Sequence, residues 1–522
     1  MLGLAVLVGC SRGTSETHPQ PAPVAQPGPA VVQTAAGAVR GLVAPGYRVF
    51  DGIPYAAAPV GPLRWQPPQP AAPWPGVRDA ATPGVRCIQD TSFDPDYGRP
   101  TGEDCLNLNV WTPDGASRSS QKPVMVWIHG GGFLNGSADI YDARWMATQG
   151  DIVVVTINYR LGTLGFLAHP ALSPDGNIGN YGLADQQFAL RWVRDNIAEF
   201  GGDPTKVTIA GESAGAMSVC DHLVAPDSAG LFRAAILQSG SCQAQADRAT
   251  ATRVSTEYAA SAGCSDPDAV AACLRSLPTR KLQRAPLYVG FGPDKLTGPV
   301  TGTDRLPVDP TTDAAPSRMP KIPVLIGSNG DEFAMFAALQ YLKDHGLPPY
   351  PKLLSDTFGP DAPAVAQHYP VDLYGGNEGL AYSAAVTDSI FACPTDRIAS
   401  GLAHTDQVYA YEFNDRTAPA PDPLRAVPFP VGASHSLELR YLFDVGGAPP
   451  LNPAQRELSD QMVAYWTQFV KNGTPEISGL PDWPQLGDDR KRMSLQTGQL
   501  TITTDFSSRH QCPFWATLKG TR

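Results

Sequence analysis

The sequence lacks several features that mark other classes of protein. Its 522 residues contain no Cys-x-x-Cys pair and no histidine at zinc-ligand spacing from a cysteine pair, so we expect neither a metal site nor a cofactor. It has no dense run of Lys and Arg, and its net charge is −11, which argues against nucleic acid as a main partner. Hydrophobic residues make up 42%, which excludes a wholly disordered chain.

The chain starts with an apolar run that is too short to span a bilayer. The stretch LGLAVLVGC has the length of a signal-peptide core and ends at Cys10. This ending resembles the bacterial lipobox, in which the cysteine is lipidated, although no Lys or Arg precedes the run. We expect residues 1–10 to be a signal segment and Cys10 to carry a lipid, the only membrane anchor. An ordinary cleaved signal is the alternative, and either reading places the protein outside the cytoplasm, in the cell envelope or secreted.

The rest of the chain divides into a short tether and one large domain. Residues 18–30, HPQPAPVAQPGPA, keep no periodic apolar pattern, so residues 11–33 are expected to form an extended tether. We see no internal repeat and no linker after residue 34. Residues 34–520 are therefore expected to be a single domain, whose oligomeric state the sequence leaves open.

The cysteine count favours an oxidising compartment. Nine cysteines are present, at positions 10, 87, 105, 220, 242, 264, 273, 393 and 512. When Cys10 is set aside for lipid, the other eight could form four disulfides. Their spacing alone does not assign the partners.

Short apolar runs alternate with helical patterns along the domain. The runs suit strands that are buried on both faces, as in a mostly parallel sheet. They cover residues 124–130, 152–160, 207–212, 234–240, 322–328 and 408–413. Residues 182–202 and 458–473 have helical spacing and end in glycine-containing pairs. This alternation predicts an α/β fold with a large, mostly parallel central sheet and helices on both faces.

The pattern Gly-x-Ser-x-Gly, which often marks a nucleophilic serine, occurs twice. GCSRG at residues 9–13 has no strand before it and a proline-rich stretch after it. GESAG at residues 211–215 lies between a β-rich run and a helix-compatible stretch, a context that holds the serine exposed in a strained turn. Ser213 is therefore the candidate nucleophile, and Ser11 is a neighbour of the lipobox cysteine.

A glycine-rich stretch supplies a candidate oxyanion hole. HGGGF at residues 129–133 directly follows an apolar run, and its glycines let backbone N–H groups turn towards a developing oxyanion. Ala214, the residue after the candidate nucleophile, supplies another donor. A tight turn is the alternative interpretation of the glycines, and their place ahead of the serine favours the oxyanion hole.

A nucleophilic serine also needs a base and an acid that holds the base. His435 stands in GASHSLELRYLF, a small-residue loop ahead of an apolar segment, whereas His222 falls on the nucleophile's own helix. Asp331 and Glu332 follow a predicted strand, at the end where active sites of open sheets gather. From the residues alone, these two carboxylates cannot be told apart.

Taken together, these motifs make the chain resemble the type-B carboxylesterase family, whose members include cholinesterases, bacterial para-nitrobenzyl esterases and fungal lipases. The matching stretches run nearly end to end: VFDGIPYAAAPVGPLRW, EDCLNLNVWTP, HGGGF, NYRLGTLGFL, GNYGLADQQFALRWVRDNIAEFGGDPTKVTIAGESAGAMS, GSNGDEF and GASHSLEL. The resemblance implies the α/β-hydrolase fold. It also implies a triad of Ser213 as nucleophile, His435 as base and Glu332 as acid.

The same resemblance assigns further positions. It implies that Gly131, Gly132 and Ala214 form the oxyanion hole, and that Glu212 and Ser218 are polar positions behind the triad. It supports the disulfides Cys87–Cys105, Cys264–Cys273 and Cys393–Cys512, which leaves Cys220–Cys242 by subtraction.

Two departures from the family pattern concern the substrate. The segment between Cys87 and Cys105 is short and holds no tryptophan, the residue type with which cholinesterase-like enzymes hold a choline cation. Phe93 and Tyr97 are the aromatic candidates there, so choline specificity is not expected. The chain also has Phe333 where the family has glycine, which is expected to reshape the wall near the acid.

The expected function is hydrolysis of small-molecule carboxylic esters, with small to medium acyl or aryl groups, through an acyl-enzyme. A lipase, or an amide or thioester hydrolase, on the same triad is the alternative within this class. A non-catalytic binding protein is the alternative outside it, because some relatives serve as adhesion domains after losing the serine. The presence of all three triad residues favours an enzyme.

Overall fold

The computed structural model describes residues 30–90, 99–173, 176–240, 242–312, 318–404 and 406–518. The expected signal segment, Cys10 and nearly all of the expected tether lie outside the described residues, as do Phe93 and Tyr97. Within the described ranges, no helix is both long enough and apolar enough to cross a membrane.

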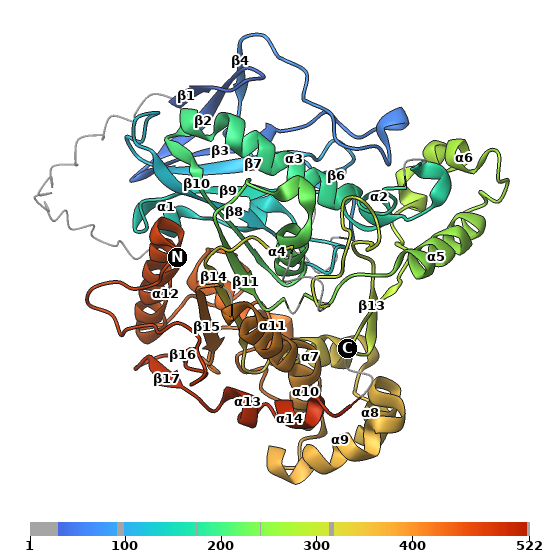
Figure 1. Cartoon of the computed structure of the whole chain (residues 1–522), viewed down its shortest axis with the longest axis vertical. Coiled ribbons are helices and arrows are strands. Elements are labelled where there is room, and N and C mark those ends of the chain that lie inside the picture. The colour runs from blue at the N-terminus through green and yellow to red at the C-terminus, as the bar shows by residue number, and fades with distance from the viewer. Residues whose placement is uncertain are drawn as a thin grey trace, which may run out of the picture.

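A large twisted sheet runs through the centre of the molecule (Figure 1). In the described part of the chain it has 13 strands, in the order β1-β2-β3-β7-β9-β8-β10-β11-β14-β15-β16-β17, with β4 beside β2. Neighbours from β9 to β16 are parallel, whereas the flanking pairs β1–β2, β2–β3, β3–β7, β7–β9 and β16–β17 are antiparallel. The six apolar runs predicted as strands are β8, β9, β10, β11, β14 and β15, all in the parallel centre.

The strands of this sheet are β1 (Ala30–Gln33), β2 (Ala38–Ala44), β3 (Tyr47–Pro54), β4 (Val77–Asp79), β7 (Asn107–Pro113), β8 (Lys122–Ile128), β9 (Val153–Ile157), β10 (Gly202–Glu212), β11 (Ala234–Gln238), β14 (Val324–Asn329), β15 (Val408–Phe413), β16 (Arg492–Leu495) and β17 (Thr501–Thr503). Two short pairs stand apart from it, β5 (Arg86–Cys87) with β6 (Thr101–Gly102) and β12 (Val289–Phe291) with β13 (Asp294–Leu296). Every residue of β9, β11, β14 and β15 is buried, which explains their continuous apolar character.

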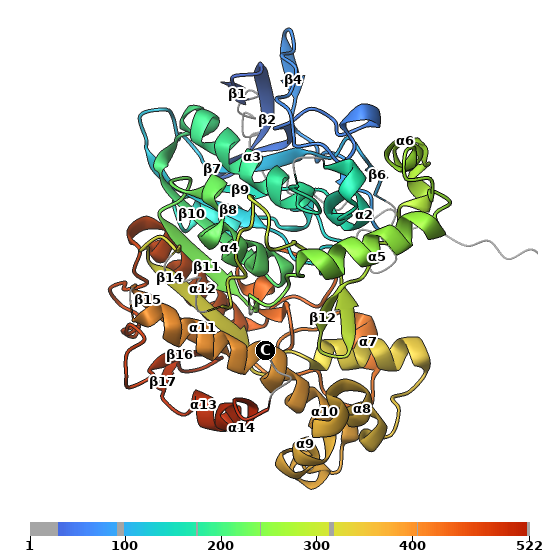
Figure 2. The same cartoon turned by 45° about the vertical axis from the view of Figure 1, so that its right-hand side comes forward.

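Helices cover both faces of the sheet (Figures 1 and 2). On one face α1 contacts β7 and β9 and packs on α12, which contacts β8 and β10. On the other face α3 and α4 contact β10, and α4 also contacts β8 and β11. The helices are α1 (Arg144–Thr148), α2 (Gly162–Phe166), α3 (Tyr181–Asn196), α4 (Ala214–Val224), α5 (Arg248–Ser261), α6 (Val270–Ser276), α7 (Ala334–Asp344), α8 (Tyr350–Phe358), α9 (Ala362–His368), α10 (Glu378–Thr387), α11 (Cys393–Ala403), α12 (Pro453–Asn472), α13 (Phe506–Arg509) and α14 (Cys512–Trp515).

The two helices predicted from sequence are present, and their ends have identifiable causes. Helix α3 passes into a 3₁₀ turn that ends at Gly201, whose φ of 92° is left-handed. Helix α12 ends at Gly473, with a φ of 74°, and begins with a capping box in which Asn452 and Gln455 exchange hydrogen bonds. The glycines therefore end the helices where the sequence predicts.

Four disulfides connect the expected partners: Cys87–Cys105, Cys220–Cys242, Cys264–Cys273 and Cys393–Cys512. The second of them ties α4 to the segment after β11, and the fourth closes the longest loop by joining α11 to α14. Four disulfides suit an exported protein, because such bonds persist in oxidising compartments.

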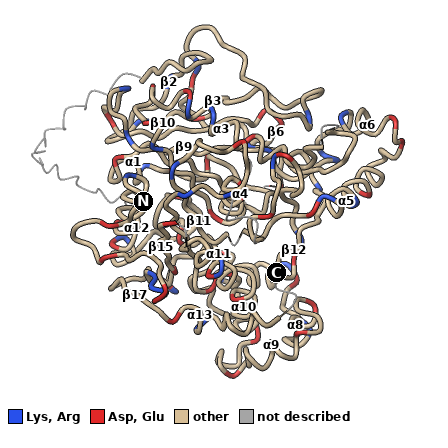
Figure 3. Tube along the Cα trace, in the orientation of Figure 1, with Lys and Arg blue, Asp and Glu red and all other residues tan. Residues whose placement is uncertain are grey.

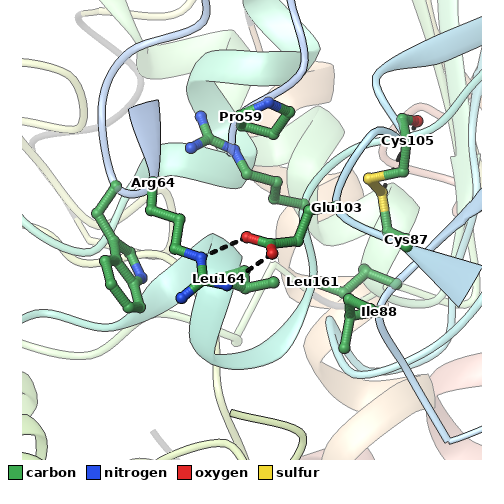
Figure 4. Close-up of a pocket in the computed structure, with 11 residues that line it drawn as sticks. Pro59, Arg64, Cys87, Ile88, Glu103, Cys105, Leu161 and Leu164 are labelled. Carbon is green, nitrogen blue, oxygen red and sulfur yellow. Dashed lines mark hydrogen bonds and ion pairs between the residues drawn. A yellow bond between two sulfur atoms is a disulfide. The ribbon is translucent and has the colours of Figure 1, made fainter. Parts of the chain in front are cut away.

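A small cavity lies beside the disulfide Cys87–Cys105, where two segments of the chain are held together (Figure 4). Its volume is about 10 Å³, room for about one water molecule. Arg64 crosses it to pair with Glu103, with Nη2 and Oε2 at 2.6 Å, and also donates to the carbonyls of Arg275 and Leu277. This arginine ties the disulfide-closed segment to the chain around α6.

Acidic and basic residues are interspersed along the trace of the described chain (Figure 3).

Candidate active site

Ser213 lies on the sharp turn between β10 and α4, in a strained backbone conformation. Its φ is 55° and its ψ is −126°, a region that residues other than glycine rarely adopt. The flanking glycines make the turn sterically feasible. A Cβ on Gly211 would lie 2.4 Å from the carbonyl carbon of Gly215, and one on Gly215 would lie 2.0 Å from the Ile128 oxygen. The Ser213 N–H donates to the Gln238 carbonyl at 2.9 Å, which ties the turn to β11.

The glycine-rich stretch after β8 lies against this turn. Gly131 and Gly132 have φ values of 102° and 61°, and a Cβ on Gly131 would come within 2.2 Å of Asn135. In the described part of the chain, no protein acceptor takes the N–H of either glycine. Ala214 is the first residue of α4, so its N–H has no acceptor within the helix. Three backbone donors are thus available near Ser213, one of them at a helix N-terminus that favours negative charge.

His435 is held by Glu332. The imidazole Nδ1 lies 2.6 Å from Glu332 Oε2, and the His435 N–H donates to the Glu332 carbonyl at 3.2 Å. The other carboxylate oxygen of Glu332 accepts the Asn329 N–H at 2.8 Å. Both side chains are buried. These contacts fix the position of the ring and turn Nδ1 towards Glu332, which leaves Nε2 on the side away from this carboxylate.

Asp331, the neighbouring carboxylate, points elsewhere. It accepts the Ala433 N–H at 3.0 Å and pairs with the exposed Arg416, also at 3.0 Å. The structure therefore brings Glu332, rather than Asp331, to His435.

The two polar positions expected behind these residues differ in their contacts. Glu212 Oε1 lies 3.2 Å from His435 Nε2 and accepts a hydrogen bond from Ser436 Oγ at 2.6 Å. Ser218 instead accepts from Gln186 Nε2 at 3.0 Å, within a network that continues to His222. The structure thus places Glu212 beside the imidazole and Ser218 among the helices beneath it.

A third buried carboxylate, which the sequence reasoning missed, lies close by. Glu438 Oε2 accepts from Asn329 Nδ2 at 2.6 Å, and its Oε1 accepts from Gln238 Nε2 at 3.3 Å. It sits on the 3₁₀ turn Leu437–Tyr441, three residues after His435. Glu438 is the one acidic residue in GASHSLELRYLF, the segment that holds His435, and this was the sequence signal that could have identified it.

The carboxylates govern the charge of the imidazole. Burial by itself lowers the pKa of His435, but the charges of Glu212 and Glu332 outweigh it and raise this pKa to about 9. Burial raises the pKa of Glu212, and it raises the pKa of Glu438 to about 8 with the help of the neighbouring glutamate charges. The site therefore stabilises a protonated imidazole, the charge state that a general base reaches after taking a proton.

Aromatic rings cover the other side of His435. The rings of Phe336 and Phe391 each lie 5.1 Å from the imidazole, centroid to centroid. Phe391 belongs to a π-helical turn, Asp388–Ala392, and no local sequence signal marks it. Phe333 is buried and stacks on Phe336 at 5.3 Å, so it supports this wall from behind.

A pocket of about 640 Å³ opens beside His435, Glu212 and Ser436. Gly130 and Gly131 form part of its wall. The apolar side chains that complete it are Ile140, Tyr141, Met335, Leu339, Pro421, Pro423, Leu424, Leu437, Leu439 and Val445. We call this space the proximal pocket. Its size and largely apolar lining suit a small organic molecule. Within the described ranges, no three His, Cys, Asp or Glu side chains are grouped to hold a metal ion.

Comparisons with known proteins show the family to which the chain belongs. The family model described as "Carboxylesterase family" matches residues 28–359 and 364–515. The acylcarnitine hydrolase of Rattus norvegicus is 34% identical over 481 residues, which cover 87% of this chain and 84% of the relative. The cocaine esterase of Homo sapiens is 34% identical over 509 residues, covering 90% and 87%. The chain belongs to the carboxylesterase family. It has the α/β-hydrolase fold of that family and is a carboxylic ester hydrolase.

Replacing Glu212 with Gln is expected to shift the pH dependence of activity. The substitution removes a charge that raises the pKa of His435, so this pKa falls below about 9. An imidazole acts as a base only when neutral, so the acidic limb of kcat/KM against pH moves to lower pH. Asp331→Asn is the matched control, since that carboxylate does not contact His435, and should leave the limb in place. An acidic limb that stays at its wild-type pH, or moves to higher pH, in Glu212→Gln would contradict this account.

Proposed function

We propose that Ser213, His435 and Glu332 carry out two-step ester hydrolysis. His435 Nε2 takes the proton of Ser213 Oγ while this oxygen attacks the ester carbonyl. The same Nε2 then gives the proton to the leaving alcohol, which leaves an acyl group on Ser213. Water, activated by His435, attacks this acyl group and releases the acid.

The oxyanion that forms in each step is held by the N–H groups of Gly131, Gly132 and Ala214. These donors are backbone groups in a rigid turn, so they need no reorganisation when charge develops. Glu332 keeps Nδ1 protonated and stabilises the imidazolium. The observation that carries the proposal is the 2.6 Å contact between Glu332 and His435, whose Nε2 lies 3.2 Å from Glu212, the residue that precedes Ser213 at the strained strand–helix turn.

The proximal pocket is proposed to receive the alcohol part of the ester. His435 Nε2, which must protonate the leaving oxygen, faces Glu212, and both residues line this pocket. Phe336 and Phe391, whose rings each lie 5.1 Å from the imidazole and do not line this pocket, are proposed to limit the acyl group to small or medium size. Among the described residues that line the pocket, Tyr141 is the one Phe, Tyr or Trp side chain, so choline, which is held by cation–π contacts, is not the proposed substrate.

Relatives of the chain carry names that refer to chemically different esters. Besides the acylcarnitine hydrolase and the cocaine esterase, a pyrethroid hydrolase of Rattus norvegicus is 34% identical over 484 residues. We therefore propose a carboxylesterase for small-molecule esters rather than an enzyme dedicated to one of these compounds. The intact serine, histidine and oxyanion glycines speak against a non-catalytic binding protein.

We also propose that the chain is exported, with Cys10 as a lipidated N-terminus. The lipobox-like sequence before Cys10 supports this, and so does the pairing of the other eight cysteines in four disulfides. A freely secreted enzyme is the alternative that the same disulfides also suit.

Removing the nucleophile tests the proposal most simply. Ser213→Ala is expected to lower turnover of para-nitrophenyl butyrate by about 10⁴- to 10⁶-fold, because the variant lacks the hydroxyl that is proposed to form the acyl-enzyme. Ser11→Ala, in the second Gly-x-Ser-x-Gly pattern, is the matched control and should keep full turnover. Wild-type activity in purified Ser213→Ala would show that the nucleophile is elsewhere.

The two neighbouring carboxylates give a second test. Glu332→Gln is expected to lower kcat by about 10³- to 10⁴-fold, because the amide cannot hold the required tautomer or stabilise the imidazolium. Asp331→Asn removes an exposed ion pair, so kcat should stay within about fivefold of wild type. Kinetics on para-nitrophenyl butyrate, with circular dichroism to confirm folding, separate the two. A larger loss in Asp331→Asn than in Glu332→Gln would reverse the assignment.

A further inference from the structure

The segment near the C-terminus holds a second buried histidine that is paired with acids. His510 lies between Asp388 and Glu412, with its Nδ1 at 2.5 Å from Asp388 Oδ1 and its Nε2 at 2.7 Å from Glu412 Oε1. All three side chains are buried. Arg509 donates two hydrogen bonds to Glu412, and the Tyr369 hydroxyl donates to Asp388 Oδ2 at 2.7 Å. We call these five residues the His510 cluster.

The acids of this cluster keep His510 charged. Burial by itself lowers the pKa of His510, but the charges of Asp388 and Glu412 outweigh it and raise this pKa to about 10. At neutral pH the ring is therefore an imidazolium that donates from both nitrogens, one to each carboxylate. Removing one partner from a buried ion group leaves an uncompensated charge in the interior, so these contacts hold their segments firmly together.

Asp388 is the first residue of the π-helical turn that carries Phe391. The turn, Asp388–Ala392, lies between α10 and α11, and the N–H of Cys393 donates to the Asp388 carbonyl, five residues back. A π-helical turn holds one residue more than a regular helix, so it reverts to an α-helix unless its surroundings hold it. Reversion rotates the residues on one side of the turn by about 100° relative to those on the other. Contacts that fix the turn therefore fix where Phe391 lies.

The segment near the C-terminus holds this turn at both ends. His510 binds Asp388, where the turn begins, and the disulfide Cys393–Cys512 joins the residue after the turn to α14. Helix α14 also packs against the turn. One short stretch of chain, residues 510–512, thus secures the turn before and after Phe391.

The turn also contacts the segments that carry the base and the acid. The ring of Phe391 lies 5.1 Å from the His435 imidazole, centroid to centroid. Thr387, the residue before the turn, accepts the N–H of Phe333 at 2.9 Å through its hydroxyl, and Phe333 directly follows Glu332 in the chain. A shift of the turn therefore acts on the wall around His435 and on the segment beside Glu332.

We infer that His510 is a positioning residue for the ester hydrolysis. By holding Asp388, it keeps the π-helical turn in place and Phe391 against His435. This inference rests on the proposed function, in which Phe391 limits the size of the acyl group. When the His510 cluster is broken, the turn relaxes and Phe391 withdraws, so longer acyl groups gain room.

The test measures acyl-chain selectivity, which depends on the place of Phe391. The readout is the ratio of kcat/KM for para-nitrophenyl octanoate to that for para-nitrophenyl butyrate, which does not change with the fraction of active protein. His510→Gln, whose neutral side chain cannot pair with both carboxylates, is expected to raise this ratio by about 3- to 10-fold. If circular dichroism shows that this variant does not fold, Asp388→Asn takes its place with the same expectation. An unchanged or lower ratio in the folded variant would overturn the inference.

A double-mutant cycle tests whether His510 acts through Phe391. Phe391→Ala is expected to raise the ratio by itself, because it removes the ring from the wall. In that background, His510→Gln should change the ratio by less than about twofold, since the group through which it acts is gone. An unchanged ratio in Phe391→Ala, or a full additional effect of His510→Gln, would overturn the inference.

His368→Ala is the matched control. His368 lies on α9 and binds the same segment near the C-terminus, since its Nδ1 is 2.7 Å from Gln511 Oε1 and its ring stacks on Phe514. The variant is expected to lower the melting temperature and to keep the wild-type ratio, because the contacts of the π-helical turn stay intact. A ratio raised as far as in His510→Gln would show general loosening of the segment and would overturn the role of His510.

Ser213→Ala separates this inference from the proposed function. If Ser213→Ala keeps wild-type hydrolysis of para-nitrophenyl butyrate, the proposed function fails. If Ser213→Ala is inactive while His510→Gln keeps the wild-type ratio, the role of His510 alone fails.

Discussion

The strained turn at Ser213 is the constraint on which the rest of the site depends. Strand β10 lies in the middle of the parallel sheet, and its last residue is followed at once by a serine with a φ of 55°. Such a turn persists only where the surroundings over-determine it. Here the hydrogen bond to Gln238 and the close approach of Gly215 to Ile128 do so. The turn places the hydroxyl at the carboxyl edge of the sheet and starts α4 with a free N–H beside it.

Burial of the glutamates and of His435 near this turn sets their charge states. Three glutamates, Glu212, Glu332 and Glu438, lie around the imidazole of His435, and all four side chains are buried. Burial raises the pKa values of Glu212 and Glu438, while the carboxylate charges raise the pKa of His435. The arrangement prefers the imidazolium, which is the state that the base reaches each time it accepts a proton. The aromatic wall of Phe336 and Phe391 keeps this charge away from solvent on the other side.

Much of the fold could be predicted because burial on both faces leaves a plain pattern in the sequence. The six central strands are continuous apolar runs, and Gly201 and Gly473 end their helices where expected. The site was harder to predict, because its decisive contacts join distant segments. Asp331 and Glu332 are equivalent locally. Their roles diverge only through Ala433, Arg416 and His435, which come from about 100 residues away. Phe391 lies on a π-helical turn that no local sequence pattern predicts.

The central claim is that one strained serine forms the acyl-enzyme. Labelling the purified, active protein with a fluorophosphonate, followed by intact mass and peptide mapping, tests it directly. The account predicts one adduct per chain, on Ser213, with activity lost in proportion to labelling. An adduct on another residue, or full inhibition without an adduct on Ser213, would contradict it.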